Sequence, residues 1–354
     1  TDNLSAPEIA LPGENFNTAL WAGNGGTQAI TGVGFEPDFT WIKARDYVEN
    51  AVAFDSVRTV DSILEPATAN AAQSAGTTIS QITSFDSDGF TVIKRASGVN
   101  YVNASGNTYV GWSWKGGGAG VTNTDGNISG TVTVSANPTA GFSIVKWTGS
   151  GVTNTVGHGL SAAPELIIAK NYTTATQNWG VGATPVYSGW TGRAGELNDA
   201  GAQATSSAYW NDTPPTASVF TVSTENNVNK STASIIAYCF HSVEGYSKVG
   251  SYEGNADADG PFVYTGFTPA WVMIKQYDAS GEGWMIYDNK RSPYNEAILR
   301  LQANTTGADD SSEDGIDIVS NGFKCRVNWA GINDSNNFLY LAFAESPFKT
   351  SNAR

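Results

Sequence analysis

The sequence has few of the residue types that carry metal or nucleophilic chemistry. Its 354 residues include only two histidines and two cysteines. Neither His158 nor His241 has a partner at a metal-binding spacing such as His-Glu-x-x-His, and no Gly-x-Ser-x-Gly nucleophile elbow occurs. His158 lies at a turn, where a hydrogen bond to the backbone is its expected role. These absences indicate a protein that is not an enzyme.

Other scarcities narrow the class of protein further. Charged residues make up only 15% of the chain, and the net charge is −14, which repels nucleic-acid phosphates. No apolar run is long enough to span a bilayer, and no signal-peptide pattern is present. Cys239 and Cys325 occupy non-equivalent positions, so we expect two buried free thiols rather than a disulfide. Neither a nucleic acid nor a membrane is an expected partner.

What the sequence does contain is a stretch that occurs three times. A glycine and a proline precede an apolar run that ends in lysine, and the proline lies six residues before the lysine each time. An aromatic-x-Gly pair precedes each copy. The copies run from Gly34 to Lys43, Gly159 to Lys170 and Gly266 to Lys275, after Trp21-x-Gly23, Trp147-x-Gly149 and Tyr252-x-Gly254. Three such copies indicate an internal repeat.

Each copy predicts a central β-strand. Proline suits the entry of a strand because it cannot donate to the ladder. Phe39 and Trp41 share one face and Ile42 lies on the other, so the strand is apolar on both faces and should be buried on both. We expect Trp41, Ile42, Ile168, Trp271 and Ile274 to be buried. The lysine is expected to mark the point where the strand returns to solvent.

Spacing and turn signals predict an all-β chain of three tandem β-sandwich modules, of jelly-roll or concanavalin-like type. The glycine-rich run from Lys115 to Gly120 is predicted to be an exposed connection. The expected division is an extended N-terminal arm at 1–15, module 1 at 16–117, a Gly-rich linker at 118–130, module 2 at 131–244, module 3 at 245–349 and a C-terminal tail at 350–354.

Nearly the whole chain resembles structural proteins encoded by marine tailed bacteriophages. The resemblance is carried by Trp21-Ala-Gly-Asn-Gly, by Gly34-Phe35-x-Pro37-Asp38-Phe39-x-Trp41-Ile42-Lys43, by Phe54-Asp55-Ser56-Val57-Arg58, by the run from Ser84 to Thr91, by the run from Ser206 to Thr213 and by the run from Gly260 to Phe267. In that family a concanavalin-like, laminin-G-type domain often precedes this region. The start at Thr1 rather than Met agrees with a processed product or a piece of a longer protein.

The resemblance implies a virion structural protein, in a surface appendage or tail fibre that mediates assembly and host attachment. It brings no catalytic residues. Expected partners are copies of the same chain, as a homo-oligomer such as a trimer, other virion proteins and a cell-surface glycan. The expected location is the virion surface or another extracellular site. The alternatives are a carbohydrate-binding module of a secreted bacterial protein and a capsid decoration protein.

Two sets of residues are candidates for ligand binding. Trp190 and Trp210 lie in loop-like contexts, where an exposed tryptophan stacks on a ligand or a subunit. The other set is a lysine, an aspartate and an arginine that recur with the same Asp-x-x-Arg spacing. Its members are Lys43, Asp55 and Arg58, and again Lys275, Asp288 and Arg291. This set is either a sugar-contact patch or a strand-end ion pair that seats the strand, and the ion pair is favoured.

No cofactor is expected, although three acidic stretches leave Ca²⁺ open as a ligand. They are Asp86-Ser-Asp88-Gly89, Asp257-Ala-Asp259-Gly260 and the run from Asp309 to Gly315. None matches the twelve-residue Ca²⁺ loop. Asx-turns explain the first two at least as well, and a solvated loop is the favoured interpretation of the third.

Overall fold

The computed structural model describes residues 11–74, 76–95, 100–313 and 315–347, and it is built almost entirely of antiparallel strands. This confirms the predicted all-β fold. Three large sheets contain most of the strands. The first joins β1 (Phe16–Ala22), β9 (Thr108–Trp114), β3 (Phe39–Ala44) and β4 (Val52–Asp55). The second joins β10 (Val121–Asn123), β11 (Val132–Asn137), β12 (Phe142–Thr148), β20 (Ser234–Phe240), β14 (Leu166–Asn171), β15 (Trp179–Ala183) and β17 (Gly195–Glu196). The third joins β21 (Ser247–Glu253), β28 (Asn337–Pro347), β23 (Phe267–Gln276), β24 (Trp284–Asp288) and β25 (Leu301–Gln302).

Each large sheet is accompanied by a smaller sheet from the same part of the chain. The smaller sheets are β2 (Thr27–Thr31), β8 (Gly89–Ile93) and β7 (Gln81–Asp86); β13 (Asn154–Gly157) and β19 (Val219–Val222); and β22 (Phe262–Tyr264), β27 (Gly322–Cys325) and β26 (Ile316–Val319). The other elements are η1 (Pro12–Glu14), β5 (Ser62–Ile63), β6 (Gln73–Ser74), β16 (Gly192–Arg193), β18 (Ala204–Thr205), α1 (Ser207–Trp210) and α2 (Asn226–Asn229).

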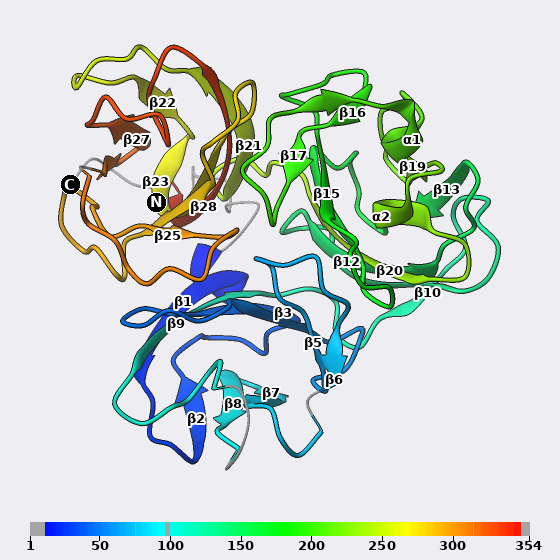
Figure 1. The fold of residues 1–354 in the computed structure, drawn as a ribbon, viewed down its shortest axis with the longest axis horizontal. Coiled ribbons are helices and arrows are strands. Elements are labelled where there is room, and N and C mark those ends of the chain that lie inside the picture. Colours follow the sequence, from blue (N-terminus) through cyan, green and yellow to red (C-terminus); the bar gives the residue numbers. More distant parts are fainter. Residues whose placement is uncertain (1–10, 75, 96–99, 314, 348–354) are drawn as a thin grey trace, which may run out of the picture.

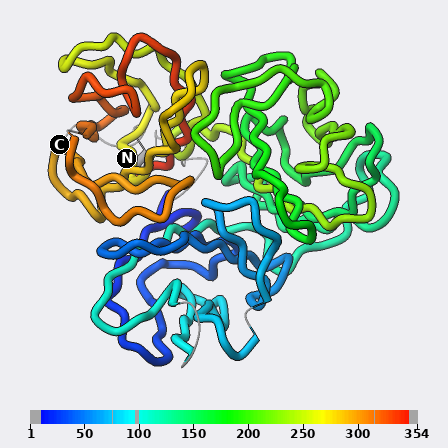
Figure 2. The backbone as a smooth tube through the Cα atoms, viewed as in Figure 1, coloured from blue at the N-terminus to red at the C-terminus, as the bar shows by residue number. Residues whose placement is uncertain are grey.

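The three sheet pairs stand around a common centre, with the large sheets inside and the small sheets outside (Figures 1 and 2). The inner faces of the large sheets form one apolar cluster with members from all three modules. Aromatic contacts connect each pair of modules, with ring-centroid distances of 4.2 Å for Phe39 and Tyr238, 6.3 Å for Trp112 and Trp271, and 6.0 Å for Phe240 and Phe343. The modules therefore share a core, which the sequence analysis did not predict.

Each module also has a core of its own between its large and small sheets. Module 1 packs residues such as Ile42, Phe54 and Phe90 there, and modules 2 and 3 have equivalent clusters. The repeated strand separates the two kinds of core. Trp41 faces the shared core and Ile42 faces the core of module 1. This is the arrangement that two apolar faces on one strand predict.

The strands β3, β14 and β23 lie in the interior of their sheets, as predicted. Their registers are equivalent, because the residue four positions before each lysine pairs with Asp55, Ala183 and Asp288 in turn. Trp41, Ile42, Ile168, Trp271 and Ile274 are all buried, which confirms that prediction. The predicted return of the lysines to solvent is wrong, since Lys43, Lys170 and Lys275 are each 0% exposed.

The predicted glycine connection is exposed at Lys115 and from Gly117 to Ala119, as predicted, but Gly116 is buried and the run has contacts that were not predicted. The Gly116 amide donates to Asp38 Oδ2 at 2.8 Å, and the Gly117 amide donates to Ser135 Oγ of module 2 at 2.8 Å. Part of the predicted 118–130 linker forms the edge strand β10, which pairs with β11. The connection is therefore exposed but tied to module 2 through the Gly117 amide.

The predicted N-terminal arm is only partly described, since residues 1–10 and the predicted tail at 350–354 lie outside the described residues. Residues Pro12–Glu14 form the short 3-10 helix η1, with proline in its first turn, where the missing amide costs nothing. The Asn15 carbonyl accepts from the Lys115 amide at 2.9 Å. Residues 11–15 are thus folded against the chain rather than extended away from it.

The structure reveals a further repeat element that the sequence analysis missed. About 80 residues after each aromatic-x-Gly pair lies a fully buried asparagine. Its side chain accepts a hydrogen bond from the backbone of the turn that follows the pair. Its Oδ1 accepts from the Asn24, Ser150 and Asn255 amides at 3.1, 2.9 and 2.9 Å. These asparagines are Asn103, Asn229 and Asn333. The even spacing was visible in the sequence, although asparagine carries little hydrophobic signal.

Replacement of Gly117 by valine should loosen the junction between modules 1 and 2. A Cβ at Gly117 would stand 2.5 Å from the Ala136 carbonyl oxygen, too close for any real contact. We expect Gly117→Val to expose the segment to limited proteolysis, while the wild-type segment resists cleavage. Gly13→Ala is the matched control, because nothing lies within 4 Å of its added Cβ. Equal cleavage of both variants and the wild type would contradict the packed junction.

Candidate functional site at the module junctions

Most of the predicted site residues meet where two modules join, beginning with the two Asp-x-x-Arg pairs. Asp55 and Asp288 each end the strand beside the repeated strand, and the arginine three residues later turns back onto the carboxylate. Arg58 Nε lies 2.7 Å from Asp55 Oδ2, and Arg291 Nε lies 2.6 Å from Asp288 Oδ2. All four side chains are nearly or fully buried. Both pairs are therefore ion pairs at the end of a strand, which confirms the favoured interpretation.

Each of these carboxylates also accepts a hydrogen bond from a different module. The Tyr238 hydroxyl of module 2 donates to Asp55 Oδ2 at 2.8 Å, and Trp112 Nε1 of module 1 donates to Asp288 Oδ2 at 3.0 Å. At the third junction Ala183 stands where the other two have the aspartate, and Leu341 stands where they have the tyrosine or tryptophan donor. Donor and acceptor were thus replaced together by apolar residues, which leaves no buried polar group unpaired.

Backbone hydrogen bonds repeat at all three junctions. The carbonyl of the residue two positions after each lysine accepts a hydrogen bond from a backbone amide of the neighbouring module. The Ala72 amide donates to the Tyr172 carbonyl at 2.8 Å, the Gln203 amide to the Tyr277 carbonyl at 2.6 Å and the Asp309 amide to the Arg45 carbonyl at 2.7 Å. A second set of backbone hydrogen bonds crosses the same junctions, from the amides of Gln177, Gly281 and Glu49 to the carbonyls of Ala69, Ala200 and Thr306 respectively. Module 2 thus docks on module 1, module 3 on module 2, and module 1 on module 3, which closes a ring (Figure 1).

The three lysines lie at the same junctions, and Lys43 is close to Arg291 of module 3. Lys275 Nζ donates to the Glu282 carbonyl of its own loop at 2.6 Å, and Lys170 Nζ donates to the Gln177 carbonyl. Lys43 differs, because its Nζ donates to the Thr305 carbonyl of module 3 at 2.6 Å. Burial lowers the pKa of Lys43 to about 8, of Lys170 to about 7 and of Lys275 to about 8.

Lys43 behaves differently because it lacks the tryptophan that lies beside each of the other two lysines. Trp179 pairs with Lys170 and Trp284 with Lys275, and each indole donates to a carbonyl of the neighbouring module. The distances are 3.2 Å from Trp179 Nε1 to the Thr68 oxygen and 3.0 Å from Trp284 Nε1 to the Glu196 oxygen. Module 1 has the small Ala51 at the equivalent position. The Lys43 ammonium takes the place of the missing indole donor there.

Trp190 and Trp210 do not form an exposed stacking surface, and that prediction is wrong. They are 1% and 0% exposed, and their rings meet edge to face with centroids 5.4 Å apart inside module 2. The neighbouring strand makes room for them with glycine, since a Cβ at Gly182 would stand 2.2 Å from Trp190 Cζ3. Loop-like sequence context did not distinguish a buried tryptophan from an exposed one here.

The acidic stretches are occupied by protein partners. Asp88 accepts the Gly32 and Gly34 amides, and Asp257 accepts the Asp259 amide in an Asx-turn. In the third stretch Asp309 is part of a junction, while Ser311 and Ser312 are exposed, as a solvated loop predicts. Asp309 pairs with Arg45 of module 1 and with Arg291, both at 2.8 Å. Within the described ranges no group of three or more His, Cys, Asp or Glu side chains could hold a metal ion.

The remaining reactive residue types have structural surroundings. His158 accepts the Leu160 amide at Nδ1 and contacts the Thr216 carbonyl through Nε2, each at 3.1 Å, which confirms its turn role. Cys239 and Cys325 are buried free thiols, as predicted, and burial raises the pKa of both, that of Cys325 to about 12. A protonated, enclosed thiol is a poor nucleophile.

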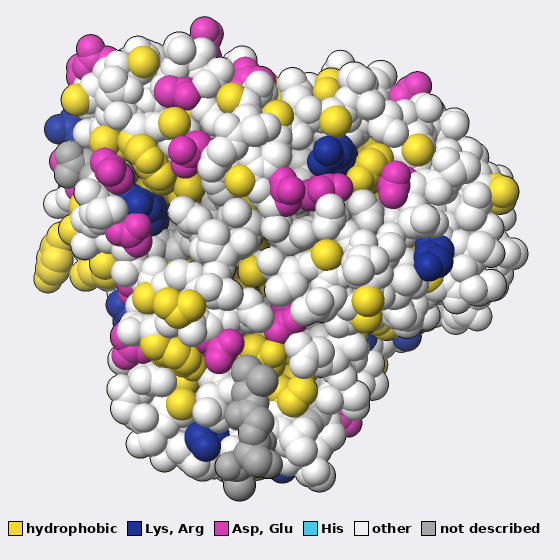
Figure 3. Space-filling view, in the orientation of Figure 1, with side chains coloured by type: hydrophobic (Ala, Val, Ile, Leu, Met, Phe, Trp, Pro, Cys, Tyr) yellow, Lys and Arg dark blue, Asp and Glu magenta, His cyan; other side chains and the backbone are white. Residues whose placement is uncertain are grey.

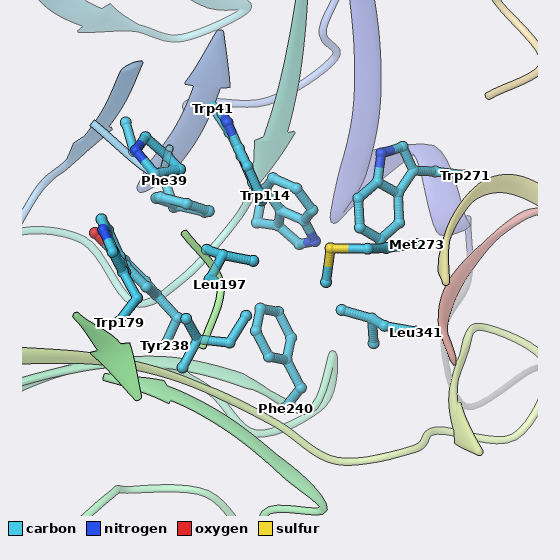
Figure 4. Close-up of a pocket in the computed structure, with 13 residues that line it drawn as sticks. Phe39, Trp41, Trp114, Trp179, Leu197, Tyr238, Phe240, Trp271, Met273 and Leu341 are labelled. Atoms are coloured by element: carbon cyan, nitrogen blue, oxygen red, sulfur yellow. The ribbon is translucent and has the colours of Figure 1, made fainter. Parts of the chain in front are cut away.

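The centre of the ring encloses a small apolar cavity. Side chains from all three modules point toward one another there (Figure 4). Its volume is about 20 Å³, close to a single water, and aromatic and aliphatic side chains line it. Such a cavity stays dry and is too small for an organic ligand. The centre is therefore a packing core rather than a binding site.

The fold and its junctions define a class of protein: an all-β repeat protein whose three modules close into a ring around a shared core. The family model described as "Domain of unknown function (DUF7483)" matches residues 11–347, and the chain belongs to this family. No curated protein and no solved structure matches the sequence significantly. Among the described residues, no helix combines the length and apolar character needed to cross a membrane.

Removal of Asp55 should destabilise the protein more than removal of Asp288. Asp55→Ala leaves the buried Arg58 without an acid, whereas in Asp288→Ala the guanidinium of Arg291 keeps Asp309. We expect Asp55→Ala to lower the free energy of unfolding by about 3–5 kcal/mol, the usual cost of breaking a buried pair. Urea unfolding measures this loss.

Asp259→Ala is the control for these variants. Its carboxylate is 80% exposed and pairs with Lys324, so the loss should stay under about 1 kcal/mol. Equal effects of the Asp55 and Asp259 substitutions would show that the junction pairs do not hold the modules.

The buried Lys170 should make stability rise with pH. Its folded pKa of about 7 lies below its unfolded value, so the unfolded chain binds more protons between these values. By linkage, the free energy of unfolding then increases as pH rises above 7. Between pH 7 and 9 we expect Lys170→Met to remove about 2 kcal/mol of this increase. Parallel pH curves for Lys170→Met and for the exposed control Lys115→Met would contradict this account.

Proposed function

We propose that this protein is a structural component of a tailed-phage virion, in a surface appendage or fibre, that works by assembly and by contact with the host surface. The supporting observation is the use that the chain makes of its buried charged groups. The buried Asp55, Asp288 and Lys43 bond across a junction between modules, and so does the partly exposed Arg45. In an active site, buried charged groups shift the pKa of catalytic residues, whereas here they join one module to the next.

The surface supports the same proposal. Backbone and uncharged polar side chains cover most of the face in Figure 3, with acidic and basic side chains lying singly or in small groups among them. A net charge of −14 spread over 354 residues favours solubility and opposes nucleic-acid binding. Fold and surface by themselves suit a durable β-repeat protein, and the resemblance to phage structural proteins adds the virion.

The ring bears on how copies of the chain assemble. Its junctions are head-to-tail contacts that close after three modules, so one chain reproduces internally what a cyclic trimer would build from three. Self-association would therefore use the outer surfaces of the modules. A homo-oligomer remains our prediction, with light scattering of the purified chain as its measurement. The same fold would also suit a capsid decoration protein.

A carbohydrate-binding module is the second candidate, and one observation favours it. Tyr294 is 83% exposed and borders a surface pocket that polar side chains also line. The two candidates are compatible, because a virion appendage that binds a host glycan performs both roles.

The test of the proposed function is to find the chain in place. Peptides spanning residues 11–347 should appear in mass spectra of purified virions, and antibodies against the chain should label an appendage or the capsid by electron microscopy. Enzymatic cleavage of a polysaccharide by the isolated protein, lost on changing one carboxylate, would contradict the proposal. Absence of the chain from purified virions would do so as well.

A further inference from the structure

Each module has a turn before its repeated strand, and the same backbone hydrogen bond closes it in all three. The amides of Val33, His158 and Thr265 donate to the carbonyls of Asp88, Ser218 and Asn321, at 3.2, 3.2 and 3.0 Å. Different side chains hold the three turns in place. In module 1 the Asp88 carboxylate accepts the Gly32 and Gly34 amides, and in module 3 Thr265 Oγ1 accepts the Phe267 amide at 3.4 Å. In module 2 a histidine holds the turn.

His158 is 0% exposed, and its ring forms hydrogen bonds through both nitrogens. Nδ1 lies 3.1 Å from the Leu160 amide nitrogen, and Nε2 lies 3.1 Å from the Thr216 carbonyl oxygen. An amide N–H can only donate and a carbonyl can only accept, so the two partners fix the neutral tautomer with its proton on Nε2. A second proton would sit on Nδ1 and face the Leu160 N–H, which would leave two buried donors without an acceptor. Both bonds therefore form only while His158 is neutral.

The sheet that His158 follows is the smallest of the three outer sheets. In the described part of the chain it consists of β13 and β19, whereas its counterparts in modules 1 and 3 have three strands each. Its last pair is Gly157 and Val219, so His158 and Ser218 lie directly beyond the end of the ladder. A two-stranded pairing has little stability of its own. We propose that His158 is a pH-sensitive switch, which keeps this sheet closed at neutral pH and opens it at that end in mild acid.

The surroundings of His158 resist its protonation. Burial lowers the pKa of His158 below the usual 6.5, and His241, directly after β20, acts in the same direction. The Thr216 carbonyl and the exposed Asp125, which follows β10, favour the charged ring but do not outweigh burial. In the open state the ring has its usual pKa, so the open state binds more protons as the pH falls through 6.5. Each further unit of acid then favours opening about tenfold, until the pH reaches the folded pKa.

Opening exposes apolar side chains that are covered at neutral pH. Val156 and Phe220 of the two strands, and Leu160 of the turn, belong to the core of module 2. The corresponding turns keep their bonds in mild acid, because threonine does not titrate and the Gly32 and Gly34 amides lower the pKa of Asp88 below its usual 3.8. Acid should therefore act on module 2 first and leave the outer sheets of modules 1 and 3 closed.

Hydrogen exchange of the full chain, followed by mass spectrometry at about pH 7.5 and about pH 5, tests the switch. Protection factors correct for the intrinsic pH dependence of exchange. We expect peptides that cover β13 and β19 to lose protection about tenfold or more at the lower pH, while peptides that cover β8 and β27 keep theirs. The matched control is His158→Thr, which gives module 2 the residue of module 3 and keeps an acceptor for the Leu160 amide. Its β13 and β19 should be equally protected at both pH values.

His241→Gln removes the other histidine and should keep the acid response. The proposal is overturned if wild-type β13 and β19 stay protected at about pH 5, if His158→Thr responds to acid as the wild type does, or if His241→Gln abolishes the response. Should circular dichroism show His158→Thr unfolded, NMR of the wild-type imidazole decides. The ring must carry its proton on Nε2 at neutral pH and titrate below 6.5. A proton on Nδ1, or titration at or above 6.5, overturns the proposal as well.

Discussion

The shared aromatic core is the constraint on which the rest of the structure depends. Each large sheet has two apolar faces, and a small sheet covers only the outer one. The inner face, with Trp41, Trp114 and Trp271 among its residues, would be exposed if a module stood alone. An exposed apolar face of that kind is costly in water, and three such faces can cover one another only around a common centre. The ring is therefore a consequence of how the strands are patterned.

Closure of the ring explains where the polar groups lie. Where two modules meet, backbone carbonyls of one module lie at the junction. A side chain of the adjacent module donates a hydrogen bond to them. The donor is an indole at two junctions and the Lys43 ammonium at the third, where Ala51 replaces tryptophan. Buried lysines are expensive to desolvate, and their lowered pKa reflects that cost. Their ammonium groups are held by backbone carbonyls.

The sequence predicted the features that follow from periodicity. Three copies of one strand with a fixed proline and lysine indicated the repeat, and apolar residues on both faces indicated burial. The same pattern could have indicated the shared core. A strand such as β3, apolar on both faces, needs a covering layer on each face, and a two-sheet sandwich covers only one of them. The lysines were misplaced because charge usually marks solvent, and a backbone carbonyl in another module leaves no trace in the sequence.

The candidate site was less predictable than the fold. The Asp-x-x-Arg spacing identified the ion pairs, but their second partners, Tyr238 and Trp112, lie more than a hundred residues away. Trp190 and Trp210 were expected at the surface because their sequence contexts are loop-like, but both are buried, and Gly182 of the neighbouring strand makes space for their rings. Tyr294 is the most exposed large hydrophobic side chain in the part of the chain that the structure describes, and it drew no attention in the sequence because no motif surrounds it.

Hydrogen exchange of the Trp41→Ala variant, followed by mass spectrometry, tests the shared core most directly. Trp41 belongs to module 1, yet its side chain lines the centre beside residues of the other two modules. If the three modules depend on one core, β14 and β23 should lose protection together with β3, because they unfold as one cooperative unit. Loss of protection confined to module 1, with β14 and β23 exchanging as in the wild type, would contradict the account.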